Sequence, residues 1–262
     1  MSRIITLTTD FGLSDGFVGV MKGVILGINP QATIVDITHD IVPQNIDQGA
    51  FVFANACKYF PSNIIHVVVV DPGVGSTRRA IVLQTGETFY IAPDNGVLTT
   101  AITNYQLPVH AVHLNRPEYW RSQVSNTFHG RDIFAPVAAH LSLGVPLEAL
   151  GDPISDWVKL SSCEMPMRAG NEIAGRVMHI DHFGNIATNI GEEMLEAMDR
   201  TRITVSIRGT VLRGVRSTYA AVERGELLAL VSSSGHVEVA ARDGNAALML
   251  GAKLGDEVVI RD

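Results

Sequence analysis

The segment Ile64–Val70, with the sequence IIHVVVV, is followed at once by Asp71-Pro72-Gly73. An almost unbroken run of β-branched residues is typical of a strand buried on both faces, as in a sheet with helices on either side. Pro72 and Gly73 indicate a turn, so Asp71 stands at the end of this strand. Ligands of open α/β sheets bind beyond the carboxyl ends of the strands, and the segment therefore predicts both the architecture and the edge that carries a site.

Strand-like and helix-like segments alternate around this run, which is the pattern of an α/β layer fold. A helix from about Phe17 to Ile28 has Asp15 as its expected cap, and a second helix, closed by Pro61, has Asp47 as its expected cap. The last helix of this part is expected to begin at Asp132. Further strands are expected at Ile4–Thr9, Thr33–Ile37, Ala80–Gln84 and Thr88–Ala92. We predict a central, mainly parallel sheet.

The pattern changes after Gly151-Asp152-Pro153. Short strand-like segments then follow at spacings of about 8–12 residues, which is typical of a small sandwich or barrel. They are Glu172–Ile180, Arg202–Ile207, Val211–Val215, Leu227–Ser232, Val237–Ala241 and Glu257–Ile260. We therefore predict an α/β domain over residues 1–160 and an all-β, barrel-like domain over residues 161–262.

Composition narrows the class of protein. The chain has 262 residues, of which 46% are hydrophobic, enough for a substantial core, and its formal net charge is −7. An acidic balance without a Lys/Arg cluster argues against a nucleic-acid surface. No apolar stretch approaches the ~20 residues that span a bilayer, and no signal peptide is evident. The two cysteines, Cys57 and Cys163, are interpreted as free thiols, and we expect a soluble, cytoplasmic protein.

Three segments carry candidate chemistry in the first domain. Asp10 and Asp71 each follow a strand and precede a turn, where an aspartate either faces the ligand crevice or merely caps the turn. The glycine-rich loop 71–79 lacks the Lys-Ser/Thr end of a phosphate loop and the spacing of a dinucleotide fingerprint, but it is long enough to place an arginine beside Asp71. His129 precedes a helix in the same region and is a candidate catalytic group.

Two polar turns stand out in the second domain. Asp181–Asn185 contains His182 and invites a metal interpretation, but the chain has no HExxH, CxxC or similar ligand spacing, and we expect no metal. Ser232–Gly235 is either a plain turn or a group of hydroxyl donors for a polar ligand.

Taken in order, these segments resemble the S-adenosyl-L-methionine hydroxide adenosyltransferases, the adenosine-forming hydrolases related to the fluorinases and chlorinases. The resemblance spans essentially the whole chain. It rests on Thr9–Gly12 with Asp15, Val70–Gly75 with Arg78, Ala92–Gly96, Phe128–Asp132, Asp181–Asn185, Ser233–Gly235 and Gly244–Ala247. It implies an α/β domain joined to a β-barrel, a homotrimer with ligands between subunits, and S-adenosyl-L-methionine as substrate without a further cofactor. The implied reaction is displacement at the ribose 5′ carbon by water, which gives adenosine and L-methionine.

The resemblance also assigns roles by motif position. Asp71, Arg78 and His129 match the residues that handle the water. The implied substrate-binding residues are Asp10 for the ribose hydroxyls, Asp181 and Ser233 for the methionine end, Asn185 and Tyr219 for adenine, and Phe128, Phe183 and Ser234 within the same motifs. Ser234 stands where the fluorinase has an arginine, so recognition of the methionine carboxylate is left open.

Rival interpretations remain open at this point. Halogenases carry an aromatic residue in place of Asp71 and a serine in place of Gly130, and the fluorinase has a threonine in place of Val74, so these positions favour a hydrolase. The alternatives are a halogenase, a non-catalytic sensor of S-adenosylmethionine or adenosine, and a metal-dependent hydrolase built on Asp10, Asp71, His129 and His182. The choice between Asp71 and His129 as the base also stays open.

Overall fold

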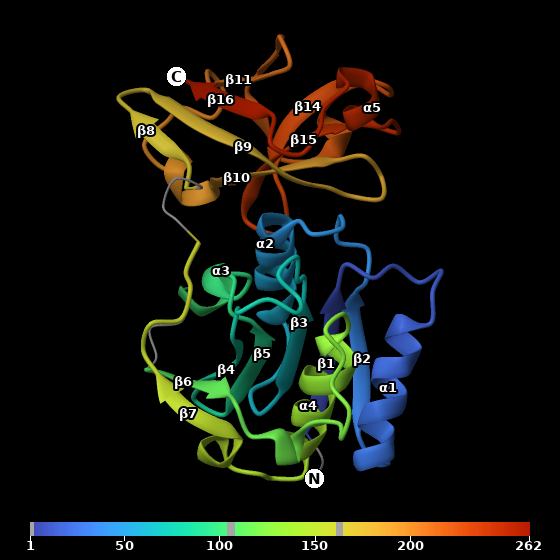
Figure 1. Cartoon of the computed structure of the whole chain (residues 1–262). Coiled ribbons are helices and arrows are strands. Elements are labelled where there is room, and N and C mark those ends of the chain that lie inside the picture. Colours follow the sequence, from blue (N-terminus) through green and yellow to red (C-terminus); the bar gives the residue numbers. More distant parts are fainter. Residues whose placement is uncertain (1–2, 104–107, 161–164) are drawn as a thin grey trace. The chain divides into compact units, whose positions relative to one another are not determined.

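The computed structural model describes residues 3–103, 108–160 and 165–262. The chain divides into two compact units, Met1–Leu160 and Ser161–Asp262 (Figure 1). Cys163 lies outside the described residues, whereas Cys57 is a buried free thiol. None of the helices in the described ranges is long and apolar enough to cross a membrane.

The first unit is built on a seven-stranded sheet with the order β2-β1-β3-β5-β4-β6-β7. Its strands are β1 (Ile4–Thr9), β2 (Thr33–Thr38), β3 (Ile65–Val69), β4 (Ala80–Thr85), β5 (Thr88–Pro93), β6 (Val109–Leu114) and β7 (Gly151–Ile154). The pairs β1–β2, β1–β3 and β3–β5 are parallel, and the other three pairs are antiparallel. The sheet is mixed, so the prediction of a mainly parallel sheet is wrong.

Two features of the chain explain the mixed sheet. A two-residue connection, Gly86-Glu87, joins β4 to β5, and so short a link can join only antiparallel strands. Gly86 has a φ of +55°, a conformation that glycine adopts without steric cost. Strands β6 and β7, which the sequence pattern did not reveal, then extend the antiparallel half.

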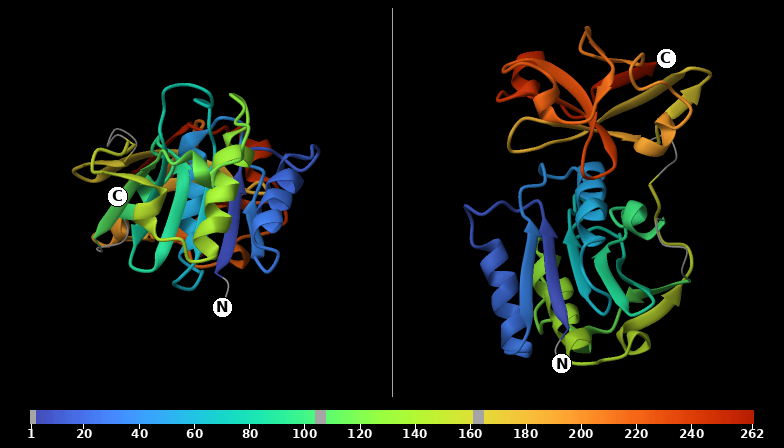
Figure 2. Two further views of the ribbon diagram at one scale, coloured as in Figure 1. Left: turned by 60° about the horizontal axis from the view of Figure 1, so that its bottom comes forward. Right: turned by 180° about the vertical axis from the view of Figure 1, so that it is seen from behind.

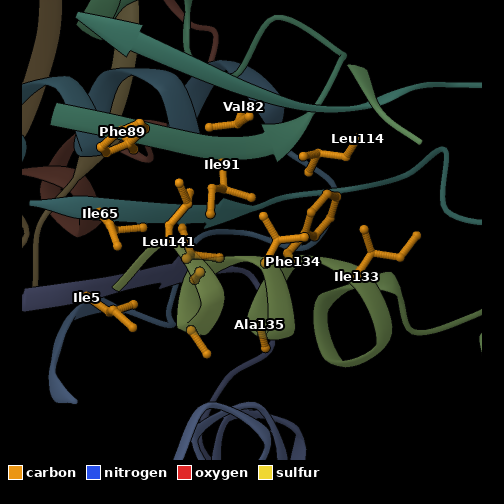
Figure 3. Packing of buried hydrophobic residues seen from close by; sticks show 14 of the residues in the cluster. Ile5, Ile65, Val82, Phe89, Ile91, Leu114, Ile133, Phe134, Ala135 and Leu141 are labelled. Carbon is orange, nitrogen blue, oxygen red and sulfur yellow. The ribbon is translucent and has the colours of Figure 1, made fainter. Parts of the chain in front are cut away.

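Strand β3 is buried along its whole length, which confirms the prediction from its sequence. Ile65, Val67 and Val69 join a core cluster with α1 (Phe17–Ile28) and α4 (Ala135–Ser142). On the opposite face, Val68 and Val70 join a second cluster with α2 (Ile46–Cys57) and α3 (Thr99–Thr103). Figure 3 shows the first cluster, in which Ile5 and Ile65 of the sheet face Ala135 and Leu141 of α4. Helices α1 and α4 pack against each other along this face (Figure 2).

The expected helix caps differ from those in the structure. The N-cap of α1 is Gly16 without a side-chain bond, and the N-cap of α2 is Asn45, whose side chain accepts a hydrogen bond from the Gln48 amide. The assignments to Asp15 and Asp47 are therefore wrong; Asn45, two positions earlier, is an equally good capping residue. A π-helical segment, Gly130–Phe134, precedes α4, so Asp132 lies inside a helical turn and does not begin the helix.

The second unit is a nine-stranded, nearly closed, barrel-like sheet with the order β12-β11-β16-β9-β10-β15-β14-β13, and β8 pairs with β9. Its strands are β8 (Met167–Ala169), β9 (Glu172–Ile180), β10 (Ile186–Gly191), β11 (Thr204–Ile207), β12 (Thr210–Arg213), β13 (Val215–Arg216), β14 (Leu227–Val231), β15 (His236–Ala241) and β16 (Glu257–Arg261). The long strand β9 pairs with β16 over its first half and with β10 over its second, and β12 contacts β14.

This unit is not all-β, because it contains the short helix α5 (Ala246–Leu250). The side chain of Asn245 caps α5 by accepting from the Leu248 amide, and Gly251, with a φ of +61°, ends it. Neither α5 nor strands β8 and β10 were predicted from the sequence.

Removing side-chain atoms from the β1 face should destabilise the first unit. Leu7 is 0% exposed and Leu143 is 57% exposed. The same substitution at each position therefore removes the same atoms, and any difference in stability is due to burial. We expect Leu7→Ala to lower the free energy of unfolding by about 2–5 kcal/mol and Leu143→Ala to change it by less than about 0.5 kcal/mol. Both tryptophans, Trp120 and Trp157, belong to the first unit, so their fluorescence in a urea titration reports on it. Equal losses in the two variants would contradict the assigned core.

Candidate active site

The site begins where three neighbouring strands meet one edge of the first sheet. Strand β5 lies between β3 and β4, parallel to the first and antiparallel to the second. The carboxyl ends of β3 and β5 and the beginning of β4 therefore lie side by side. Asp71 follows β3 and Arg78 precedes β4, so the loop 71–78 leaves this edge and returns to it.

Glycine allows this loop to fold tightly. Gly75 has a φ of +76°, and a Cβ atom there would lie 2.2 Å from the main-chain oxygen of Asn126. No other residue type satisfies both constraints without moving the backbone. The hydroxyl of Ser76 donates to the Gly73 carbonyl at 2.6 Å and fastens the turn.

Arg78 joins the two candidate catalytic side chains. Its Nε lies 3.0 Å from Oδ1 and 3.1 Å from Oδ2 of Asp71, and a terminal nitrogen lies 2.7 Å from Nδ1 of His129. The Arg78 and Asp71 side chains are only 10% and 6% exposed, and the guanidinium lies 5.5 Å from the centre of the Phe134 ring. Because arginine has only donors, Nδ1 of His129 must accept, so the proton of the neutral ring is on Nε2.

The environment of His129 favours this neutral form. Burial lowers the pKa of its imidazole, and the positive charge of Arg78 lowers it further, against smaller opposing effects of Asp71 and Asp132. Asp132 holds the preceding segment in place by accepting from the amide and the hydroxyl of Ser125. Its hydrogen bonds, led by the one from Arg131, outweigh its burial and lower the pKa of Asp132 to about 2.

Asp71 and His129 line a pocket of about 300 Å³. Asp10 and Phe128 line the same pocket, together with Phe11, Phe17, Pro43, Gln44, Val69, Val74, Thr127 and Gly130. The Gln44 amide donates to Oδ2 of Asp10 at 2.7 Å. Burial raises the pKa of Asp10, and the nearby charge of Asp71 adds to this effect. The structure thus brings together the candidate residues of the first unit. Asp10, Asp71, Phe128 and His129 line the pocket, and Arg78 is hydrogen-bonded to Asp71 and His129.

A second pocket, of about 780 Å³, lies within the second unit. Asp181, Phe183, Asn185 and Tyr219 all line it. The Asp181 carboxylate accepts from the main-chain amides of Phe183 and Asn185, at 2.9 and 2.8 Å, and from Nδ2 of Asn185 at 2.9 Å. Phe183 is 73% exposed, so its ring is available for contact.

Tyr219 is oriented by a buried carboxylate. Its hydroxyl donates to Oε1 of Glu238 at 2.8 Å. Burial, together with this carboxylate, raises the pKa of Tyr219 to about 12, and burial raises the pKa of Glu238 as well. The phenol therefore stays protonated and holds its ring at the pocket wall.

Ser233 and Ser234 lie apart from these residues. They belong to the turn between β14 and β15, whereas Ala241, at the other end of β15, lines the second pocket. The hydroxyl of Ser234 is 2.8 Å from that of Ser232. The second unit therefore groups Asp181 with the two residues expected at adenine, and not with Ser233.

Several residues at the pockets were not predicted from the sequence: Gln44, Phe17 and Arg242 line them, and Glu238 binds the Tyr219 hydroxyl. Glu238 had a recognisable signal, since a carboxylate in the apolar strand β15 must find a buried partner. Gln44 had none, because its role depends on its main-chain amide and on a φ of +66°. Among the described residues, no group of three or more His, Cys, Asp or Glu side chains is arranged to hold a metal ion.

The fold and the two pockets define a class of protein: a mixed α/β unit with an Asp–Arg–His cluster at its sheet edge, followed by a barrel-like unit with its own ligand-sized pocket. The chain belongs to the SAM hydroxide adenosyltransferase family. The model of the family's N-terminal domain matches residues 5–151 and that of its C-terminal domain matches residues 175–259.

Individual relatives cover nearly the whole chain. An (R)-S-adenosyl-L-methionine hydrolase of Salinispora tropica is 40% identical over 257 residues, which are 97% of this chain and 96% of the relative. A fluorinase of Nocardia brasiliensis is 29% identical and covers 98% of this chain. The crystal structure of an uncharacterized conserved protein from Thermotoga maritima has 39% identity and a TM-score of 0.91, with coverage of 98% of this chain and all of that one.

The contact between Arg78 and His129 should be visible in proton titration. We expect His129 to titrate below the ordinary value of about 6.5, and Arg78→Gln to raise its midpoint, since a neighbouring cation is removed. His140, whose pKa is lowered by burial alone, is the internal control and should not move. Imidazole NMR signals followed against pH measure both. An unchanged His129 midpoint in the variant would show that the two side chains do not interact.

Proposed function

We propose that this protein hydrolyses S-adenosyl-L-methionine to adenosine and L-methionine by direct displacement at the ribose 5′ carbon. The observation that carries the proposal is the Asp71–Arg78–His129 cluster, two members of which line one pocket with Asp10. The names of the relatives, hydrolases over the full length, support the same reaction.

The chemical difficulty lies with the nucleophile. A sulfonium is already a good leaving group, whereas neutral water attacks weakly. A water that gains hydroxide character cancels the sulfonium charge as it attacks, and a pocket shielded from bulk water favours that cancellation. Holding the water in line at about 3–3.5 Å from the carbon supplies much of the remaining acceleration.

The hydrogen bonds support different proposed roles for Asp71 and His129. With Nδ1 accepting from Arg78, His129 presents only the Nε2 proton and acts as a donor that orients the water. Asp71 is then the group with lone pairs facing the pocket, and it accepts the proton or the hydrogen bond of the water. Arg78 acts through both, because its guanidinium fixes the carboxylate and the ring relative to each other.

The residues proposed to bind the substrate are assigned by motif position. Asp10 accepts hydrogen bonds from the ribose hydroxyls, and Phe128, which lines the same pocket, contacts the ribose. Adenine binds in the second pocket, in contact with Asn185, Phe183 and Tyr219. Asp181, which lines the same pocket as these three, contacts the methionine end where it leaves adenine, and Ser233 and Ser234, in the turn between β14 and β15, contact it farther along.

We also propose that the protein is a cytoplasmic homotrimer with its sites at subunit interfaces. Light scattering should give a mass near three times the 28.2 kDa of one chain.

A halogenase is the second candidate, because fluorinases are relatives of this chain. Two observations favour the hydrolase. The apolar Val74 lines the pocket, and a Cβ atom on Gly130 would lie 3.2 Å from Met21 Sδ and from a Phe128 ring carbon. A hydroxyl-bearing side chain at position 130 would therefore be crowded. Added chloride or fluoride should give no 5′-halo-adenosine.

The direct test is turnover with each epimer of the substrate at sulfur, since the relatives are named for the R form. We expect equal amounts of adenosine and methionine, measured by liquid chromatography, with faster turnover of the R epimer. Substrate that is retained intact would instead indicate a binding sensor.

Replacing the proposed acceptor should remove most of this activity. We expect Asp71→Asn to lower kcat by about 10²-fold or more, since the amide is a poor acceptor for the proton of water. Asp152→Asn is the matched control, because Asp152 forms an exposed pair with Arg116 at 2.7 Å, and it should retain normal turnover. Near-normal kcat in Asp71→Asn would exclude Asp71 as the acceptor.

A further inference from the structure

The turn Asp94-Asn95-Gly96 directly follows β5, which ends at Pro93, and has no part in the proposed chemistry. It nevertheless lies at the same sheet edge as Asp71 and Arg78, because β5 is the strand between β3 and β4. Its two polar side chains are both engaged. Asp94 is one of the buried charged residues of the first unit, with a side chain 3% exposed.

Asn95 binds the strand end that carries Asp71. Its Nδ2 donates to the main-chain oxygen of Val70 at 2.8 Å, and its Oδ1 accepts from the Val97 amide at 3.2 Å. Val70 immediately precedes Asp71, and its carbonyl belongs to the peptide group that connects the two residues. The Asn95 amide therefore fixes the orientation of the backbone from which the Asp71 side chain extends.

Asp94 binds the other end of the same loop. Its main-chain amide donates to the oxygen of Arg79 at 2.9 Å, and its Oδ2 accepts from Nε of Arg79 at 2.8 Å. Its second oxygen accepts from the Val158 amide at 2.7 Å. Arg79 immediately follows Arg78, so Asp94 fixes the backbone that carries the guanidinium. Arg79 also binds Asp156 at 2.8 Å, which ties this end of the loop to the segment that leaves the first unit.

We propose that Asp94 and Asn95 are positioning residues for the Asp71–Arg78 pair, an inference that rests on the proposed function of that pair. One holds each end of the loop 71–78, and neither lines the pocket. Catalytic geometry is sensitive at this scale, since a shift of about 1 Å in a reacting group can cost about 10²-fold in rate. The loop is glycine-rich and depends on such external bonds for its position.

The test compares Asn95→Ala with Asn55→Ala. Asn55 makes the same kind of bond, from Nδ2 to the Phe51 carbonyl at 3.1 Å, but within helix α2 and away from the loop. We expect Asn95→Ala to lower kcat at least about 10-fold with KM within about twofold, because the binding residues are unchanged. Asn55→Ala should change neither. Equal kcat values in the two variants would overturn the proposal.

A second variant and a second readout keep the result interpretable. Asp94→Asn retains an oxygen for Val158 but loses the ion pair with Arg79, and it serves if Asn95→Ala does not fold. The NMR midpoint of His129, which Arg78, Asp71 and Asp132 face, should rise in either variant as Arg78 moves away.

This midpoint does not depend on turnover. If the unmodified protein fails to hydrolyse the substrate, the proposed function fails, and the midpoint alone still decides whether Asp94 and Asn95 position the loop. An unchanged midpoint together with an unchanged kcat would mean that the two residues only stabilise the fold.

Discussion

The site depends on one nearly buried cation. Arg78 lies between a carboxylate and an imidazole, with bonds to both, and its side chain is only 10% exposed. A charge in such a place requires a partner, since breaking a buried pair leaves an uncompensated ion. The glycine-rich loop must therefore fold back over the sheet edge, and the His129 segment must approach it from the start of α4. The tautomer of His129 follows from this contact, and the roles proposed for Asp71 and His129 at the attacking water depend on it.

The topology of the sheet provides the second constraint. Because β5 is parallel to β3 and antiparallel to β4, two strand ends and one strand beginning converge at a single edge. A fully parallel sheet would place only carboxyl ends there, and a loop as short as 71–78 could not return to it. The antiparallel half of the sheet is thus part of what makes the site. The turn after β5 lies between the two arms of the loop and contacts both.

The strands of the first sheet could largely be predicted from the sequence, whereas their directions were predictable only in part and the helix caps were not. The run Ile64–Val70 revealed a strand buried on both faces, because only such strands tolerate continuous apolar residues. The antiparallel half was only partly predictable: the short gap between the expected strands Ala80–Gln84 and Thr88–Ala92 permits only an antiparallel pair, whereas β6 and β7 carry interspersed polar residues and were not recognised. The assignments of helix caps to Asp15 and Asp47 were wrong, because several capping residues lie close together and backbone geometry chooses among them.

For the site, too, the residues could be predicted from the sequence but their contacts could not. Candidate residues could be found by their place after strands and by family motifs, whereas the bond from Arg78 to His129 joins segments 51 residues apart and depends on the whole fold. Gln44 contributes only a main-chain amide, which no side-chain pattern reveals. Glu238 was identifiable as a charge within an apolar strand, but its partner Tyr219 was not.

The most direct measurement is the fate of the oxygen atom. The protein is incubated with S-adenosylmethionine in water enriched in oxygen-18, and the adenosine is analysed by mass spectrometry with fragmentation of the ribose. Displacement by water at the 5′ carbon predicts one heavy oxygen per labelled adenosine, located at the 5′ position, in a fraction equal to the enrichment of the water. Adenosine without the label at that position would contradict attack by a solvent water and, with it, the role assigned to Asp71, Arg78 and His129.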